Sequence, residues 1–529
     1  MKRRKFYLQV LRAIPDIPIQ SRGLLGGRIG VRFRESLGSE AIPSPFFLTM
    51  ECDNIATMDF QKFFKGKKVT QMGLGLLGRG VGDAEFLVRM GSDLIVTDLK
   101  NESELRPSLE KLKKFKNIKY VLGIHRLEDF RGVDFILKAA GVPIDSPYII
   151  EARNSGVLIE MDASLFAKLA PKGVTVIGVT GTRGKSTTAH LIFHILKTAF
   201  SSKVKGLKLK VKSSPRVFLA GNVKDTATLP LLLKVKAGDF VVLELDSWQL
   251  QGFGDAKISP HIAVFTNFMD DHLNYYRGDR EKYFSDKANI FKYQEKGDAL
   301  VVGEQAALRV RRAKPPIVPT VARSSDVPSS WKPKIIGEHN SLNISCARAA
   351  ARALGIDDVT IQKAVESFTG VEGRLQFLRE VKGVQIYNDN SATTPDATLA
   401  GIRALGKALG GSTSKLPDLE VEPRSMGIVL IMGGADKGLD MSKLVQEIPK
   451  YCKALVLLPG SGTEMLQVTS YKLQIEVVEV LNLHNAVRRA LDYATKGDTI
   501  LFSPAFASFG MFQNEYDRGE QFTKIVESL

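Results

Sequence analysis

Cysteine and long apolar runs are both scarce in this chain of 529 residues. The three cysteines, Cys52, Cys346 and Cys452, lie far apart and have neither the spacing of a zinc site nor that of a disulfide framework. No run of about 18 apolar residues is present, so no membrane span is expected. The basic amino-terminal stretch is interrupted by polar residues and by Pro15, which argues against a signal peptide. Together these absences predict a protein of the reducing cytoplasm.

Positive charge is in excess, with a formal net charge of +17 at pH 7. Such an excess suits either nucleic acid or small anionic substrates. The sequence contains no basic stripe interleaved with aromatic residues and no recognisable nucleic-acid motif. Its densest lysine run, residues 203–212, alternates charged with apolar residues, which is typical of a strand with one solvated face. Anionic substrates are therefore favoured, and nucleic-acid binding stays open as an alternative.

Strand-like and helix-like segments alternate along most of the chain, whose length predicts about three or four domains. We expect one α/β unit over residues 59–159, a second over 160–370 and a third over 371–529. Residues 1–58 have turn signals instead, which predicts an amino-terminal extension, either flexible or an upstream start. Residues 406–425 have the composition of a loop. No internal repeat of solenoid length is present.

The segment GVTGTRGKSTTAH, residues 178–190, joins an apolar, β-branched stretch to one with helical spacing. A glycine-rich turn at this junction directs backbone N–H groups and the positive end of a helix toward one point, which suits a phosphate. Lys185 adds a charge for the β- and γ-phosphates, and the hydroxyl of Ser186 or Thr187 can reach Mg²⁺. Val179 stands in place of the usual first glycine. The segment predicts an ATP site.

A second glycine-rich turn, Gly73-x-Gly75-x-x-Gly78, follows a predicted strand of the first unit. Asp98 lies some 20 residues further on, at the end of the next predicted strand. This pattern is typical of dinucleotide binding, so an NAD-dependent dehydrogenase is one alternative. A chain that has both this turn and an ATP-type loop favours a different interpretation, two nucleotides bound in two domains.

Acidic side chains follow two predicted strands of the second unit. Glu244 lies near the end of the apolar stretch VVLEL, and a carboxylate beside a phosphate loop is a usual ligand of Mg²⁺. Asp270, Asp271 and His272 come directly after the next predicted strand. Two carboxylates and an imidazole at a strand end suit metal coordination or acid–base catalysis.

Asn340 and Asn343 stand three residues apart at the start of an alanine-rich helix, so they share one face. Their amides can pair with a purine edge, and N-capping by Asn340 is the alternative. Polar residues also follow predicted strands of the third unit, in segments 387–398, 433–438 and 503–522. Ligands of open α/β sheets bind at this edge.

Taken in order, the segments TGTRGKST, AGN, LELDSWQL, DDHL, GEHNSLN, YND and SPAFAS resemble the Mur ligase family, the ATP-dependent amide-forming enzymes of peptidoglycan synthesis. The resemblance begins near residue 59 and covers nearly everything to the end. It implies an α/β fold of three domains: a Rossmann-like UDP-binding domain, a central P-loop-type ATPase domain with a parallel sheet, and a C-terminal Rossmann-like domain. The pattern is most similar to members that join D-glutamate to UDP-N-acetylmuramoyl-L-alanine through an acyl phosphate.

The resemblance also implies roles for individual residues. The UDP-linked substrate would be bound by Gly75, Leu76, Leu77, Gly78, Asp98 and Asn222. ATP would be bound by Gly181, Thr182, Gly184, Lys185, Ser186, Thr187, Asn340, Asn343, Arg374 and Asp389. Two Mg²⁺ ions would be held by Ser186, Glu244, His272 and Lys287, the last as a carbamylated lysine. The catalytic residues would be Lys185, His272 and Lys287. The incoming amino acid would be bound by Thr393, Lys437 and Ser508.

Two departures from the family pattern fall in the predicted amino-acid pocket. Ser391 stands where many members have lysine, and Glu515 stands where some have an aromatic residue. The identity of the amino acid therefore stays open. Open alternatives are another Mur ligase, a folylpolyglutamate-type synthase, an NAD-dependent dehydrogenase and a nucleic-acid-binding ATPase. The resemblance implies a cytoplasmic monomer that acts on small molecules, without nucleic-acid or membrane partners.

Overall fold

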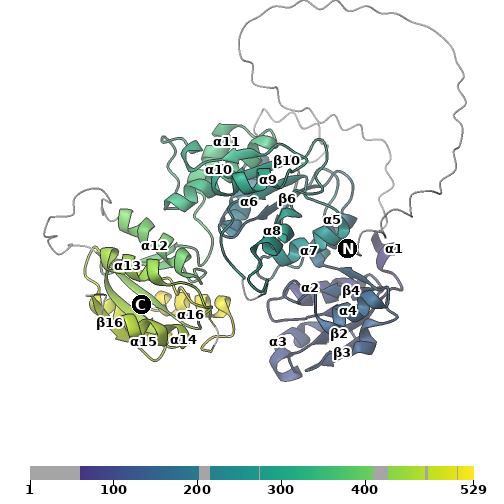
Figure 1. The fold of residues 1–529 in the computed structure, drawn as a ribbon, viewed down its shortest axis with the longest axis horizontal. Coiled ribbons are helices and arrows are strands. Elements are labelled where there is room, and N and C mark those ends of the chain that lie inside the picture. Colours follow the sequence, from purple (N-terminus) through teal and green to yellow (C-terminus); the bar gives the residue numbers. More distant parts are fainter. Residues whose placement is uncertain are drawn as a thin grey trace, which may run out of the picture. The chain divides into compact units, whose positions relative to one another are not determined.

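Three β-sheets, each flanked by helices, make up the part of the chain that this computed structural model describes (Figure 1). The described residues are 60–201, 215–272, 275–408, 427–470, 473, 475–508 and 510–529. The predicted extension, the lysine run 203–212 and most of the predicted loop 406–425 lie outside them. The α/β class with three units, predicted from the sequence, is confirmed.

The first unit is a five-stranded parallel sheet in the order β3-β2-β1-β4-β5. Its strands are β1 (Lys68–Met72), β2 (Asp93–Asp98), β3 (Ile118–Leu122), β4 (Phe135–Lys138) and β5 (Leu158–Glu160). Its helices include α1 (Phe60–Phe64), α2 (Arg79–Arg89), α3 (Glu102–Leu112) and α4 (Pro147–Asn154). The strand order reverses between β1 and β4, beside the turn that leaves β1. Ligands of open sheets bind at such a reversal.

The second unit is a six-stranded parallel sheet in the order β11-β10-β9-β6-β8-β7. Its strands are β6 (Thr175–Thr180), β7 (Val217–Gly221), β8 (Phe240–Glu244), β9 (Ile262–Phe265), β10 (Ala299–Gly303) and β11 (Thr320–Ala322). Its helices are α6 (Lys185–Ser201), α7 (Ser247–Ala256), α8 (Arg280–Ala288), α9 (Glu304–Arg312), α10 (Glu338–Ala353) and α11 (Asp358–Ser367). Strand β6 lies between β8 and β9, so the ends of these three strands form one edge.

The third unit has six strands in the order β12-β13-β17-β14-β15-β16. The strands are β12 (Gln376–Val381), β13 (Val384–Asn388), β14 (Ile428–Gly433), β15 (Cys452–Leu458), β16 (Glu476–Glu479) and β17 (Thr499–Phe502). The helices are α12 (Pro395–Ala408), α13 (Ser442–Tyr451), α14 (Ser461–Ser470), α15 (Leu483–Tyr493) and α16 (Glu515–Glu527). All neighbours are parallel except β12 and β13. Strand β12, which was not expected from the sequence, is an edge strand joined to β13 by a tight turn.

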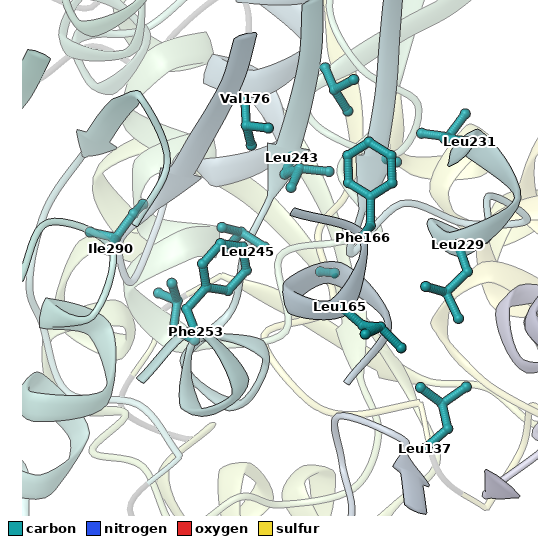
Figure 2. Packing of buried hydrophobic residues seen from close by; sticks show 14 of the residues in the cluster. Leu137, Leu165, Phe166, Val176, Leu229, Leu231, Leu243, Leu245, Phe253 and Ile290 are labelled. Carbon is teal, nitrogen blue, oxygen red and sulfur yellow. The ribbon is translucent and has the colours of Figure 1, made fainter. Parts of the chain in front are cut away.

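One hydrophobic core continues from the first unit into the second. Helix α5 (Asp162–Leu169) follows β5 and supplies Leu165 and Phe166 to this core. Figure 2 shows these side chains among residues of the second unit such as Leu243 of β8, with Leu137 of β4 in the same cluster. The buried apolar surface therefore joins the two units through α5.

Helix α6 forms because apolar residues recur at helical spacing on its inner face. Ala189, Ile192 and Leu196 are fully buried, together with Leu191 on the same helix. They pack into a second core that lies between the sheet, α10 and α11. This packing fixes the helix whose first turn carries Lys185. No helix in the described part of the chain is long and apolar enough to cross a membrane.

Replacement of Leu191 by alanine is expected to lower the free energy of unfolding of the second unit by about 2–5 kcal/mol, because it leaves a cavity in a closely packed core. Urea denaturation followed by circular dichroism measures the change. The matched control is Leu308→Ala on α9, whose side chain is 63% exposed. Equal effects of the two substitutions would contradict the packing described for α6.

Candidate active site

The predicted phosphate loop occupies residues 181–184, between β6 and α6. Gly181 and Gly184 both have positive φ, at 143° and 80°. A Cβ on Gly181 would lie 1.9 Å from the Thr266 hydroxyl oxygen, and one on Gly184 would lie 2.2 Å from Asn343 Oδ1. Both positions therefore require glycine. The loop leads into the first turn of α6, whose free backbone N–H groups suit an anion.

Lys185 folds back over this loop. Its Nζ donates hydrogen bonds to the carbonyl oxygens of Gly181, at 3.2 Å, and Thr182, at 3.1 Å. Desolvation lowers the pKa of Lys185, and the nearby carboxylate of Glu244 opposes this shift. Within the described residues, both acceptors of the ammonium are neutral carbonyls. The charge of the ammonium therefore remains available to an anion. Thr187, also predicted, is buried in the first turn of α6.

Two predicted metal ligands lie after the strands that flank β6. Glu244 is the last residue of β8 and is buried. His272 follows β9 with a φ of 53°, and its ring lies 4.7 Å from that of Trp248, centroid to centroid. Burial lowers the pKa of His272 and so favours the neutral imidazole that binds metals. Among the described residues, no three His, Cys, Asp or Glu side chains are gathered closely enough to hold a metal.

Lys287 is buried on α8 beside the phosphate loop and is only 1% exposed. Its Nζ donates to the carbonyl oxygen of Gly181 at 2.9 Å and lies 3.5 Å from the Thr180 hydroxyl. The ammonium also lies 4.9 Å from the centre of the Tyr283 ring. Desolvation, reinforced by the charge of Lys185, holds the pKa of Lys287 well below its usual range. The neutral amine is therefore favoured.

Asn340 and Asn343 share one face of α10, as predicted. Asn343 Nδ2 donates to Asn340 Oδ1 at 2.9 Å, and Asn340 Nδ2 donates to the carbonyl oxygen of Ile336 at 2.8 Å. The N-cap of the helix is Gly337, so N-capping is not the role of Asn340. The two amides are buried beside the phosphate loop, where Gly184 approaches Asn343.

Two predicted ATP residues come from the third unit. Arg374 Nη2 donates to the Ser186 hydroxyl at 2.9 Å, which connects the unit to the first turn of α6. Asp389 follows β13 and accepts hydrogen bonds from the Ser503 hydroxyl at 2.8 Å and from the Leu375 amide at 3.0 Å. Burial raises the pKa of Asp389 to about 7. The structure brings Arg374 to the first turn of α6 and places Asp389 beside Leu375, the residue after Arg374.

The three predicted amino-acid ligands lie at the carboxyl edge of the third sheet. Lys437 Nζ donates to the Thr393 hydroxyl at 2.9 Å. Ser508 is buried and lines a recess with Gly434 and Arg518. Arg518 is fully buried, and burial lowers its pKa to about 10. A buried guanidinium at this edge favours a ligand that carries negative charge.

Asp98 holds the glycine-rich turn of the first unit in place. Its carboxylate accepts hydrogen bonds from the amides of Leu74, at 2.8 Å, Gly75, at 3.0 Å, and Lys100, at 2.9 Å. This role was not expected from the sequence. Leu76, like Gly75, is half-buried in the turn. Contact of Asp98 with uracil stays a prediction.

The same turn meets the second unit at its carboxyl edge. Arg79 Nη1 donates to Asn222 Oδ1 at 2.9 Å, and the Asp225 amide donates to the carbonyl oxygen of Leu77 at 3.1 Å. A Cβ on Gly78 would lie 2.9 Å from Asp225 Oδ1, so glycine allows this approach. Asn222 therefore lies beside the turn, as the predicted substrate site requires.

Three arginines that border the predicted ligand positions were not predicted from the sequence. Arg79 follows Gly78 directly, Arg183 is the variable residue of TGTRGKST, and Arg518 lies within segment 503–522. Each arginine is a cation within or beside a motif that the sequence already shows. That position could have identified each of them as a candidate. Their partners are distant in sequence and become visible only in the fold.

The chain belongs to the Mur ligase family. The pattern that defines the Mur ligase middle domain matches residues 179–344, and the pattern of the Mur ligase glutamate ligase domain matches residues 373–506. Family membership bears out the resemblance stated from the motifs and decides against a dehydrogenase or a nucleic-acid-binding ATPase.

Particular relatives match over nearly their whole length. The UDP-N-acetylmuramoylalanine–D-glutamate ligase of Roseiflexus sp. (strain RS-1) is 36% identical over 501 residues, covering 88% of this chain and 99% of the relative. The ligase of the same name from Acetivibrio thermocellus is 30% identical over 516 residues, covering 90% and 99%. The solved UDP-N-acetylmuramate-alanine ligase from Thermotoga maritima superposes with a TM-score of 0.56 at 20% identity, covering 87% and 99%. That last similarity shows the fold alone.

Replacement of Asp389 by asparagine is expected to change how stability depends on pH. The pKa of Asp389 is about 7 in the folded chain and about 4 in an unfolded one. Its stabilising contribution is therefore full below pH 4 and is lost as the pH rises through 7. Asparagine does not titrate, so the stability of the variant relative to the wild type should rise across this range.

Urea denaturation at several pH values between 4 and 8 measures this difference. The matched control is Asp492→Asn, on the exposed surface of α15. A difference for Asp389→Asn that stays constant with pH would contradict the raised pKa of Asp389.

Proposed function

We propose that this chain joins D-glutamate to UDP-N-acetylmuramoyl-L-alanine, with ATP converted to ADP and phosphate, in the cytoplasmic synthesis of peptidoglycan precursors. The near-full-length match to relatives named as D-glutamate ligases carries the proposal. The match of the third unit to a glutamate ligase domain, and the buried Arg518 at the edge of that unit, also favour an acidic amino acid. A monomer that needs no nucleic acid or membrane is sufficient for this reaction.

ATP is proposed to bind at the phosphate loop of the second unit. Lys185 would turn from the loop carbonyls toward the β- and γ-phosphates, which offer its ammonium charged acceptors. Arg374 would donate to the phosphates from the opposite side, because its guanidinium already reaches Ser186. The amide pair Asn340–Asn343 would face adenine, and Asp389 would face the ribose.

The donors at this edge fit a Mg²⁺ ion, which prefers oxygen ligands. They include the Glu244 carboxylate, the Ser186 hydroxyl and the neutral imidazole of His272. A bound ion would neutralise charge on the transferred phosphoryl group. These protein donors lack a further carboxylate, which a carbamate on Lys287 would supply for a second ion.

Lys287 has the properties that carbamylation requires. Its amine is buried beside the phosphate loop and its lowered pKa favours the uncharged, nucleophilic form. The nitrogen lone pair would attack CO₂, a proton would leave, and a carbamate would form. This reaction replaces a buried neutral amine, next to Lys185, by an anion. The carbamate would then attract the ammonium of Lys185.

The reaction would begin with the alanyl carboxylate of the UDP-linked substrate, placed by Asn222 and the Gly75–Gly78 turn. An oxygen of this carboxylate attacks the γ-phosphorus of ATP, ADP leaves, and an acyl phosphate forms. Lys185 and Arg374 stabilise the charge of the transferred group. The amine of D-glutamate, held by Thr393, Lys437 and Ser508, then attacks the acyl carbon. Phosphate leaves from the tetrahedral intermediate and the amine loses a proton, which yields the amide.

Water must be excluded while the acyl phosphate exists, because hydrolysis would consume ATP without forming the amide. The third unit contributes Arg374 to the phosphate loop of the second, and it also carries the amino-acid ligands. We infer that approach of the third unit brings the amine to the acyl phosphate and displaces water from it.

Phosphate release with ATP and UDP-N-acetylmuramoyl-L-alanine, screened against D- and L-amino acids, tests the proposed function. Lys185→Ala is expected to abolish phosphate release, because the ammonium that neutralises the triphosphate is removed. The same variant should bind UDP-N-acetylmuramoyl-L-alanine as the wild type does, since that substrate is assigned to the first unit. Calorimetric titration measures this binding. Near-normal turnover would reject the assignment of the loop.

Lys287→Ala is expected to be almost inactive and to recover part of its activity in the presence of small carboxylates such as acetate or formate. The added anion would occupy the place of the carbamate. The comparison variant is Lys282→Ala, on the exposed part of α8, which should keep wild-type activity with or without these anions. Full activity of Lys287→Ala without any anion would remove this residue from the site.

A further inference from the structure

The guanidinium of Arg183 uses all five of its N–H groups. Its Nε and Nη2 donate to the two carboxylate oxygens of Asp396, at 3.0 and 3.2 Å, in a paired geometry. Nη2 also donates to the Thr394 hydroxyl at 2.9 Å. Nη1 donates to Asp271 at 2.7 Å and more weakly to the carbonyl oxygen of Thr182 at 3.4 Å. Two-point pairing of arginine with a carboxylate is both strong and directional.

These partners belong to two different units. Asp271 follows β9 of the second unit. Thr394 and Asp396 lie at the start of α12 in the third unit. Asp271 holds the guanidinium from one side. Its carboxylate accepts the Nη1 hydrogen bond at 2.7 Å. Asp396 also lies in the first turn of α12, where a negative charge is favoured.

The backbone of Arg183 is fixed as firmly as its side chain. Its amide donates to Asn267 Oδ1 at 2.8 Å, and its carbonyl oxygen accepts from the Thr266 hydroxyl at 2.5 Å. The guanidinium therefore leaves the phosphate loop in a set direction. Any movement of Asp396 relative to the loop must break the paired hydrogen bonds.

The segment that Arg183 holds is the one that carries predicted ligands. Thr393, which receives the hydrogen bond of Lys437, directly precedes Thr394. Asp389 lies at the other end of the same segment, after β13. Contact with Asp396 thus fixes the distance between the phosphate loop and the amino-acid ligand Thr393.

A role as a direct phosphate ligand is the competing interpretation of an arginine in a phosphate loop. It is disfavoured here because each N–H group of Arg183 already has an acceptor, and three of these acceptors are carboxylate oxygens. Lys185, by contrast, has only neutral carbonyl acceptors. The loop therefore offers one cation to a phosphate and uses the other to hold the third unit.

We propose that Arg183 is a positioning residue that holds the third unit against the phosphate loop and so places the amino-acid ligands beside the acyl phosphate. We call its contact with Thr394 and Asp396 the clasp. The inference rests on the proposed function and adds to it a residue with no predicted role. It assigns Arg183 and Asp396 to the amine-transfer half of the reaction, whereas Lys185 serves the phosphoryl-transfer half.

The test compares the wild type with Asp396→Asn, Arg183→Gln and the double variant. Phosphate release gives kcat and the KM for D-glutamate, and calorimetry with a non-hydrolysable ATP analogue gives a Kd. Asp396→Asn is expected to raise the KM for D-glutamate about tenfold while the Kd of the analogue changes less than twofold. Arg183→Gln should do the same, and the double variant should be no worse than Arg183→Gln, because loss of either partner already breaks the Arg183–Asp396 pair.

Two further variants support the comparison. Arg403→Gln, on the same α12, removes an arginine whose partner Glu447 belongs to the third unit itself, and it should leave the KM for D-glutamate unchanged. Arg183→Lys keeps the charge but loses the paired geometry, so its KM should lie near that of Arg183→Gln. If Arg183→Gln fails to fold, Asp396→Asn and Thr394→Ala test the clasp from its other side.

Three results would overturn the clasp. One is an unchanged KM for D-glutamate in Asp396→Asn. Another is a double variant whose KM rises by the product of the two single-variant increases. The third is an analogue Kd that rises tenfold in Arg183→Gln alone, which would make Arg183 a phosphate ligand.

The clasp and the proposed function fail in different ways. A wild type that releases no phosphate with any amino acid would reject the proposed function. The clasp would then be tested by small-angle scattering. With the ATP analogue bound, Asp396→Asn should have a larger radius of gyration than the wild type. Equal radii would overturn the clasp without bearing on the function.

Discussion

The adjacent carboxyl ends of β6, β8 and β9 are the constraint on which the rest of the site depends. Strand β6 pairs with both of the others, so the phosphate loop, Glu244 and the Asp271–His272 segment leave the sheet at one edge. Because parallel strands all end on the same side, the positive end of α6 and the acidic residues face the same space. A glycine-rich loop and two acidic segments that lie far apart in the sequence are thereby brought to one edge of the sheet.

Burial gives this edge its electrostatic character. Lys185 and Lys287 both hydrogen-bond to the Gly181 carbonyl oxygen, and desolvation lowers the pKa of each. Two amines so close together cannot both be charged without cost. An anion between them, whether a triphosphate or a carbamate on Lys287, relieves that cost. The free site is thus arranged to be stabilised by the groups that the proposed reaction brings to it.

Side-chain contacts connect each of the three units to another. Arg79 of the first unit reaches Asn222, Arg374 of the third reaches Ser186, and Arg183 of the second reaches Asp396. Each contact is made by a guanidinium, whose fixed geometry transmits position better than a flexible ammonium does. A reaction that passes a phosphoryl group and then an amine through one point requires such mutual placement.

Local sequence determined many of the helices and strands and the two glycine-rich turns of this protein. Spacing of apolar residues and glycines with positive φ are local properties, so α6 and its loop were predictable from residues 178–190 alone. Tertiary structure decided the strand order, which sets β6 between β8 and β9 although β7 follows it in the chain. It also decided that Asp98 holds a turn and that Arg183 meets a carboxylate 213 residues away. The physical reason is that a side-chain hydrogen bond depends on which strands are neighbours, and no short stretch of sequence specifies that order.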